Sequence, residues 1–476
     1  SAAETFAISG DLTASANSWS MGDAALLQSG GAMQIDTVVG MDLAQVASGS
    51  TLALTSGAEI ALRETMNSVD SITLQAADAI TLSDAAQLVS GNSLSVDSDS
   101  FTMGTGANLQ VAADFDATTT NGQHFALVDV DGNAVLTAGG DIAFSEAANI
   151  GSDLTIVDGD NLTMTDHVAV TGNANLTLRG DVTQSAGQQF TIGNDLTASA
   201  NSWSMGDAAL LQSGDAMQID TVAGMDLAQV DSGSTLALTS GAEIALRETM
   251  NAVDSITLRA TDAISLSDAA QLVSGNSLSV DSDSFTMGPG ASLQVAAGFD
   301  ATTTNEQHFA LVDLEGNATL TAGGDIAFNE VADFGGSLTI ADGNHLNLIG
   351  DVTVGSSGAA NANLTLRGDV TQSAAETFAI SGDLTASANS WSMGDAALLQ
   401  SGGAMQIDTV VGMDLAQVAS GSTLALTSGA EIALRETMNS VDSITLQAAD
   451  AITLSDAAQL VSGNSLSVDS DSFTMG

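Results

Sequence analysis

Acidic turns are the segments of this sequence whose residue types and spacing suggest chemistry most directly. They are "DVDGN" (129–133), "VDGDN" (157–161) and "ADGNH" (341–345). Carboxylate and carbonyl oxygens are the ligands that Ca²⁺ prefers. No EF-hand is complete, since the twelfth position counted from Asp129 is Gly140 rather than Glu. We expect weak Ca²⁺ binding at most and no other cofactor, and the candidate ligands are Asp129, Asp131, Asp158 and Asp160.

Paired carboxylates and histidines are the candidates for catalysis. The acid pairs are Asp97/Asp99, Asp281/Asp283 and Asp469/Asp471, and the histidines are His124, His167, His308 and His345. Glycoside hydrolysis needs two carboxylates facing each other across a substrate, and a general base needs a partner within hydrogen-bond reach. No companion base accompanies the acid pairs, and no Ser/His/Asp set recurs with the histidines. We therefore expect surface histidines, no catalytic residues and no enzyme.

Charge and composition restrict the partners of the chain. Its 476 residues include 58 acids and 6 bases, all Arg, for a net charge of −52. Binding to nucleic acid or to an anionic membrane needs Lys and Arg to displace counterions, so both partners are excluded. Hydrophobic residues reach 44% and aromatic residues only 3%, which predicts an ordered fold with a thin core of Leu, Ile, Val, Met and Ala.

Cysteine is absent, which removes disulfides and thiolate sites. No stretch approaches the ~18 consecutive apolar residues of a membrane-spanning helix. The chain opens on "SAAETFAISG" without a basic region followed by an apolar one, so we expect no signal peptide within it.

Long repeats organise the chain. "DLTASANSWSMGDAALLQSG" begins at Asp11, Asp195 and Asp383, and residues 1–104 are identical to 373–476. The large repeats are 11–194, 195–382 and a partial 383–476, and the full period is 372 residues. Because the chain starts and stops inside a repeat, we interpret 1–476 as one continuous solenoid cut from a longer array.

A shorter repeat of about 20 residues lies inside the long one. The expected first apolar positions of successive units are Leu12, Met33, Leu52, Ile72, Leu94, Phe115, Val135, Leu154, Leu176 and Leu196. Each unit contains three short apolar segments, called pulses below, which follow one another at similar offsets, as those that begin at Leu52, Ile60 and Met66 do. Nine such units fill one 184-residue repeat.

Each pulse alternates apolar and polar residues, as in Ile72 and Leu74, which is typical of a strand with one buried face. Pairs such as Gly91-Asn92 separate the pulses, and both residue types tolerate positive φ at a sharp corner. Three short strands and three tight corners per ~20 residues predict an all-β, single-stranded parallel β-helix with triangular turns. A βαβ unit needs ~30 or more residues with a helical stretch, and an immunoglobulin-like domain would leave the 20-residue period unexplained.

Stacking lets successive turns bury apolar pulses that one turn cannot bury alone. With neighbouring strands ~4.8 Å apart, roughly 23 turns would form a rod of about 110 Å. The varied spacing and corners favour the right-handed form over the regular left-handed one.

The units "STLALTSGAEIALRE", "DSITLQAADAITLSDAAQLVSGN" and "NANLTLRGDVTQSA" resemble the repeats of filamentous haemagglutinin-like proteins and other large repetitive bacterial adhesins. The resemblance covers essentially the whole chain and implies a long right-handed β-helix. It also implies secretion through an outer-membrane partner, although nothing here is similar to the secretion domain of that family.

Three functions remain open at this point. The first is a non-catalytic extracellular filament or stalk of a bacterium, and the second is a surface adhesin that binds a glycan or another cell-surface ligand. The third is a polysaccharide-degrading β-helix enzyme, which the uniform turns disfavour. We expect an extracellular or cell-surface location, a cell-envelope anchor outside these residues, and lateral or end-to-end association with further copies of the repeat array.

Overall fold

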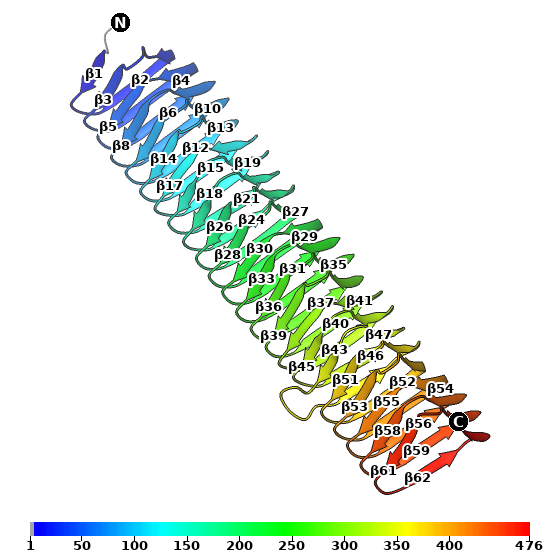
Figure 1. Ribbon diagram of the computed structural model, residues 1–476. Coiled ribbons are helices and arrows are strands. Elements are labelled where there is room, and N and C mark those ends of the chain that lie inside the picture. Colours follow the sequence, from blue (N-terminus) through cyan, green and yellow to red (C-terminus); the bar gives the residue numbers. More distant parts are fainter. Residues whose placement is uncertain (1–3) are drawn as a thin grey trace. The chain divides into compact units, whose positions relative to one another are not determined.

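The computed structural model of the protein describes residues 4–476. These residues form parallel β-strands and contain no helix (Figure 1). The chain divides into two compact units, Ser1–Thr235 and Leu236–Gly476, and each unit is a β-solenoid. The prediction of an all-β parallel β-helix is confirmed, whereas continuity across the boundary between the units stays a prediction.

One turn of the solenoid contains three strands, which define three faces. In the first unit a representative turn consists of β6 (Leu52–Ser56) on the first face, β7 (Glu59–Leu62) on the second and β8 (Thr65–Ser68) on the third. The next turn begins with β9 (Ile72–Ala76), which pairs with β6 in parallel and places Ile72 opposite Leu52. Alternation along each strand therefore sends every second side chain into the core.

Apolar side chains stack in columns along the core. Leu74 lies between Leu54 and Val96, and Ile80 lies between Ile60 and Phe101. All six are 2% exposed or less. Burial of such columns is the main term that stabilises the stack.

Aromatic residues contribute more to this core than the composition suggests. Among the described residues, two Trp and eleven Phe are 2% exposed or less. In the first unit Phe125 contacts Phe101, Phe115 and Phe144 with ring centroids 5.2–5.9 Å apart. The expectation of a purely aliphatic core is wrong, because nearly all of the few aromatic residues point inward.

The expected register is also wrong at two turns. On β18 (Ala134–Ala138), Ala134 rather than Val135 lies opposite Phe115, and the burial pattern places Val135 on the outside. Leu176 points inward but occupies the second inward position, opposite Ile156. Both errors arise because a small inward residue carries little hydrophobic signal.

Some strands pass through the first corner instead of ending there. β4 (Met33–Leu43) covers the first and second faces in one strand, and β2 (Leu12–Ser20) pairs with it through a register shift between Ala16 and Ser18. β27 (Leu196–Met205) and β29 (Met217–Leu227) repeat the arrangement. A bulge bends the strand sharply, so the expected three short strands are replaced in these turns by one long strand and one short one.

At the Gly-Asn corners the glycines are needed for close approach rather than for positive φ. A Cβ on Gly91 would lie 2.0 Å from the carbonyl oxygen of Val69 in the turn before, and one on Gly233 would lie 1.8 Å from that of Gly214. Gly91 is not among the residues with positive φ, whereas Ala85 at the second corner has φ 59°. The predicted reason for the Gly-Asn corners is therefore wrong: stacked backbones leave no room for a side chain.

Candidate functional site

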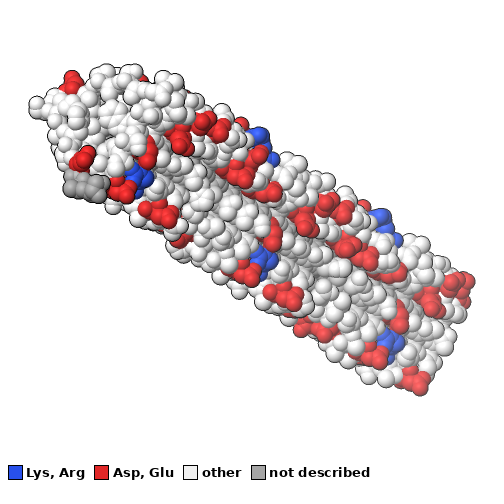
Figure 2. Space-filling view, turned by 90° about the horizontal axis from the view of Figure 1, so that it is seen from above, with Lys and Arg blue, Asp and Glu red and all other residues white. Residues whose placement is uncertain are grey.

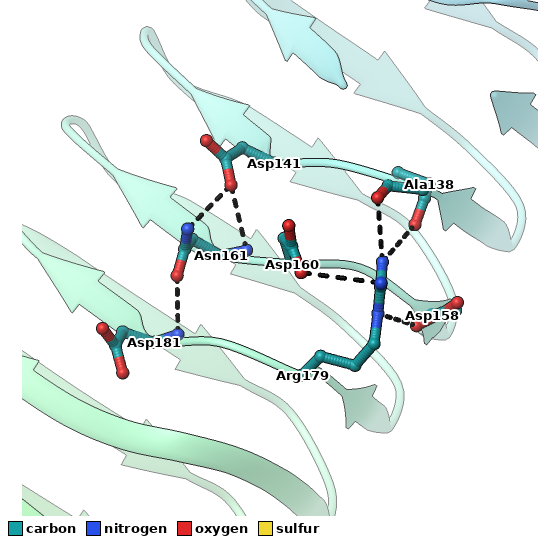
Figure 3. Close-up of polar contacts among 8 residues, drawn as sticks. Ala138, Asp141, Asp158, Asp160, Asn161, Arg179 and Asp181 are labelled. Atoms are coloured by element: carbon teal, nitrogen blue, oxygen red, sulfur yellow. Dashed lines mark hydrogen bonds and ion pairs between the residues drawn. The ribbon is translucent and has the colours of Figure 1, made fainter. Parts of the chain in front are cut away.

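The candidate calcium ligands Asp158 and Asp160 lie at the first corner of the first unit and contact an arginine. Arg179 follows β24 (Ala174–Thr177), and its Nε donates to Asp158 Oδ1 at 2.9 Å. Its Nη1 lies 3.6 Å from Asp160 Oδ1, and its Nη2 donates at 3.0 Å to the carbonyl oxygen of Gly139, 40 residues earlier (Figure 3). One guanidinium group thus joins three successive turns and partly neutralises both carboxylates.

A ladder of side-chain acceptors runs beside this arginine (Figure 3). Asp141 Oδ1 accepts hydrogen bonds from the Asn161 side-chain amide at 2.8 Å and from its backbone N–H at 3.2 Å. Asn161 Oδ1 accepts the backbone N–H of Asp181 at 2.8 Å. Each acceptor therefore satisfies a corner N–H of the next turn, which would otherwise lack a partner.

Asp181 carries the ladder one turn further. Its Oδ1 accepts hydrogen bonds from the Ser202 hydroxyl and from the Asn201 amide, each at 2.7 Å. The Ser202 bond, followed by the Asn201 bond, lowers the pKa of Asp181 below its ordinary value. Hydrogen bonds to a carboxylate favour its charged form.

The second unit repeats the cluster with two replacements, Asn344 at the position of Asp160 and His345 at that of Asn161. Arg367 donates through Nε to Asp342 at 2.9 Å and through Nη2 to the carbonyl oxygen of Gly323 at 2.8 Å. His345 occupies the position of Asn161, and its Nδ1 accepts the backbone N–H of Asp369 at 2.9 Å. Two chemically different side chains therefore accept the same corner N–H in the two repeats.

A second kind of arginine cluster lies at the second corner. Arg63 bonds to the carboxylates of Asp42 and Asp23 and to the carbonyl oxygen of Met21. The hydrogen bond that Arg63 donates to Asp42 is the largest cause of the raised pKa of Arg63. In the second unit Arg435 makes the corresponding bonds.

The glutamate that follows this arginine also reaches across two turns. Glu64 Oε1 accepts the backbone N–H of Ala24 at 2.8 Å, 40 residues away. Ala24 has φ 57°, which is a strained conformation for alanine. The carboxylate holds that N–H in place, and Glu436 does the same for Ala396 at 2.9 Å.

The remaining calcium candidates and acid pairs do not converge on a common centre. Asp129 points outward from β17 (Leu127–Val130), and Asp131 lies in the following corner, where its N–H bonds to Val111. Asp97 accepts a bond from Gln75, whereas Asp99 accepts bonds from Thr120 and Asn121. Residues 4–476 contain no group of three or more His, Cys, Asp or Glu that could hold a metal ion.

The histidines occupy two different settings. His124 points outward from β16 (Gln123–Phe125), and His308 occupies the equivalent position on β41 (Gln307–Phe309). His167 Nδ1 accepts the backbone N–H of Gln189 at 2.9 Å, which makes it a corner acceptor like His345. Only His124 and His308 therefore project from a strand toward solvent.

His124 borders a shallow groove of about 460 Å³ on the second face of the first unit. Its other lining residues include Thr102, Asp141, Ala143 and Thr163. Asp141 is already committed to Asn161, so no free carboxylate pair faces the groove from these residues. Figure 2 shows acidic residues spread over the visible face, with the visible arginines beside them.

Inward-facing serines are polar ladder residues that the sequence reasoning missed. Ser48, 4% exposed, ends β5 (Gln45–Ser48), and its hydroxyl donates to the carbonyl oxygens of Thr51 at 2.8 Å and Gly31 at 3.1 Å. Ser90 makes the equivalent bonds at 2.8 and 3.1 Å. The signal was present in the sequence, since each serine stands at an inward position directly before a corner glycine.

No protein-family model, no curated protein and no solved structure matches the chain. Residues 4–476 contain no helix long and apolar enough to cross a membrane.

Proposed function

We propose that the protein is a non-catalytic structural element, a segment of an extracellular filament or stalk of a bacterium. The proposal rests on one observation, which is that arginine side chains bond to other turns of the solenoid. Arg63, Arg179, Arg367 and Arg435 each bond to groups about 40 residues away, two turns distant. Charged side chains that could have acted in catalysis thus connect neighbouring turns of the solenoid instead.

Charge and repeat pattern also support this role. A surface with a net charge of −52 repels other acidic chains and keeps the protein soluble. The uniform turns bury one core column after another, and such arrays resist local unfolding through nearest-neighbour contacts. The bacterial origin and the cell-surface location rest on the resemblance of the repeats to large bacterial adhesins.

Electron microscopy of the purified chain tests the proposal. We expect unbranched rods of roughly 110 Å, set by ~4.8 Å per turn. Separate beads or a compact particle would contradict it. A sample with acidic and neutral polysaccharides should show no release of sugar, and measurable turnover would replace the structural proposal with an enzymatic one.

Substitution of an arginine tests whether its contacts between turns stabilise the solenoid. Arg367→Met should lower the free energy of unfolding of the second unit by about 0.5–1 kcal/mol, because the guanidinium is half exposed. The control is Arg259→Met in the same unit, since Arg259 forms no ion pair among residues 4–476. If the two substitutions changed the free energy of unfolding equally, the contacts across two turns would not support the structural proposal.

The groove beside His124 supports a second candidate function, that of an adhesin binding a neutral glycan. Its lining of Thr102, Thr163 and His124 offers hydroxyl and imidazole groups that can bond to sugar hydroxyls. A glycan array with the wild-type protein and His124→Ala tests this function. Retained binding in His124→Ala would exclude the groove, and no binding in either protein would leave the structural role alone.

A further inference from the structure

One corner of the second unit differs from its equivalents. Between the third and first faces the chain turns in three residues, as in Thr171–Asn173 between β23 (Val168–Val170) and β24. The exception lies between β48 (Val352–Val354) and β49 (Ala362–Thr365), where seven residues, 355–361, connect the strands. Figure 1 shows this loop, in yellow, reaching out past the neighbouring corners beside β51 (Thr377–Ile380).

Ordinary corners are closed by hydrogen bonds to the turn before. Thr171 N–H bonds to Ile150 at 2.8 Å, and Gly172 N–H bonds to Ser152 at 2.9 Å. A protease binds its substrate as an extended strand through backbone hydrogen bonds. Segments whose backbone groups are already paired with neighbouring turns cannot be bound in this way.

The seven-residue loop lacks this protection at its centre. Residues 356–359 are all exposed. In the described chain, the N–H groups of Ser357 and Ala359 have no hydrogen-bond partner, and that of Gly358 bonds only within the loop, to Gly355 at 3.2 Å. Gly355 has φ +84°, a conformation that favours glycine and starts the departure from the stack.

The centre of the loop is tied to the stack by two side-chain hydrogen bonds. Ser357 Oγ donates to the carbonyl oxygen of Gly335 at 2.7 Å, and Ser381 Oγ donates to that of Gly358 at 2.6 Å. These bonds involve hydroxyl groups at the surface, which water can replace. Opening the loop at its exposed residues 356–359 therefore requires no loss of core packing, because Ala360 is the buried alanine of the loop and lies beyond them.

We propose that residues 355–361 are a limited-proteolysis site for a serine endopeptidase with a small specificity pocket. The loop sequence "GSSGAAN" offers only small side chains before its last residue, and a narrow pocket selects such residues. The enzyme hydrolyses one peptide bond within 356–360. Water adds across the amide, which leaves a carboxylate on one side of the cut and an amine on the other.

Cleavage does not separate the two fragments. β48 pairs with β45 (Ala332–Phe334) and β51, while β49 pairs with β46 (Leu338–Asp342) and β52 (Leu384–Met393). Each strand beside the cut thus keeps its neighbours on both sides. The product is a nicked solenoid with two new chain ends at one corner.

Pancreatic elastase acting on the native wild-type chain tests the proposal, with the cut mapped by intact mass. We expect the first cut within 355–361, an uncut corner at Thr171–Asn173 in the same reaction, and fragments that elute together in size exclusion. A first cut elsewhere, or fragments that separate under native conditions, would overturn the proposal.

A deletion variant lacking residues 355–358 restores a three-residue corner. Cleavage at this corner should slow at least about tenfold, because the site then opens only with the hydrogen-bonded stack. Cleavage at the wild-type rate would contradict the role of the loop. Should the deletion disturb folding, Ser356→Asp with Ala359→Asp changes only exposed positions and keeps the loop length while blocking a small pocket, and an unchanged rate there counts equally against the proposal.

Discussion

Replacing two adjacent residues of β18 by the same amino acid tests the register of the stack. Val135 and Leu136 are neighbours, but Leu136 is 1% exposed and lies between Ala117 and Ile156, whereas Val135 points outward. Val135→Thr therefore places a threonine on the outer side of the strand, and Leu136→Thr places the same side chain on the inner side. Only the inward substitution should disturb the core.

The expected costs differ severalfold. Truncation of a buried Leu costs about 2–5 kcal/mol through lost transfer energy and the remaining cavity. A buried hydroxyl without a partner adds about 1–3 kcal/mol, although the hydroxyl can find a carbonyl and the cavity can shrink. We expect about 3–5 kcal/mol for Leu136→Thr and no more than about 0.5 kcal/mol for Val135→Thr, which is a near-isosteric surface change.

Hydrogen exchange of residues 127–158 is the suitable assay, because a repeat array need not unfold in one step. A loss of 3 kcal/mol corresponds to an exchange rate more than about 100-fold faster. Leu136→Thr should show this acceleration in β18 and in its neighbours β15 (Phe115–Thr119) and β21 (Leu154–Asp158). Equal acceleration by Val135→Thr would refute the register and restore Val135 as the inward residue.

Three further predictions concern corners and carboxylates. Gly316→Ala should cost about 2 kcal/mol or more, since its Cβ would lie 1.9 Å from a carbonyl oxygen, while Gly298→Ala, which meets nothing within 4 Å, should be neutral in a urea titration. Burial and the carboxyl of Asp351 raise the pKa of Glu376, so the stability that this group contributes is present below its ordinary pKa and lost as the pH rises through the folded value. Glu376→Gln should therefore stabilise the second unit at pH 7 by less than about 1 kcal/mol and not at pH 3, and a gain at both pH values would count against this account. The lowered pKa of Asp181 has the opposite effect on stability, which is present above the ordinary pKa and lost as the pH falls. Asp181→Asn should therefore cost about 0.5–1 kcal/mol at pH 7, and thermal melts should show the difference vanishing below about pH 3.

Much of the fold follows from short-range patterns in the sequence. Alternation in segments such as Ile72–Leu74 predicts strands, and the 20-residue spacing predicts turns, because both depend on neighbouring residues. The pattern failed where an inward position holds a small residue, as at Ala134. In β4, Val38 and Val39 are apolar but exposed at a bulge, so alternation alone does not describe that strand.

The polar clusters could not be predicted in the same way. The contact between Arg179 and Gly139 spans 40 residues and depends on the length of every corner between them. Asp158 was proposed as a calcium ligand from its local segment, and the structure places it beside that arginine instead. Sequence identifies which residues can form such contacts, but the corner lengths decide which of them meet.

The pairing of equivalent strands bears on how the gene can change. Leu26 lies opposite Gln45 on neighbouring third-face strands, and Leu398 lies opposite Gln417 in the same way. Because equivalent turns of successive blocks present the same surface to the turn that follows, recombination that adds or removes a whole repeat block leaves every junction matched. We expect natural alleles to vary in copy number by whole repeat blocks, so that the span of the protein is adjusted in evolution without any change of its individual parts.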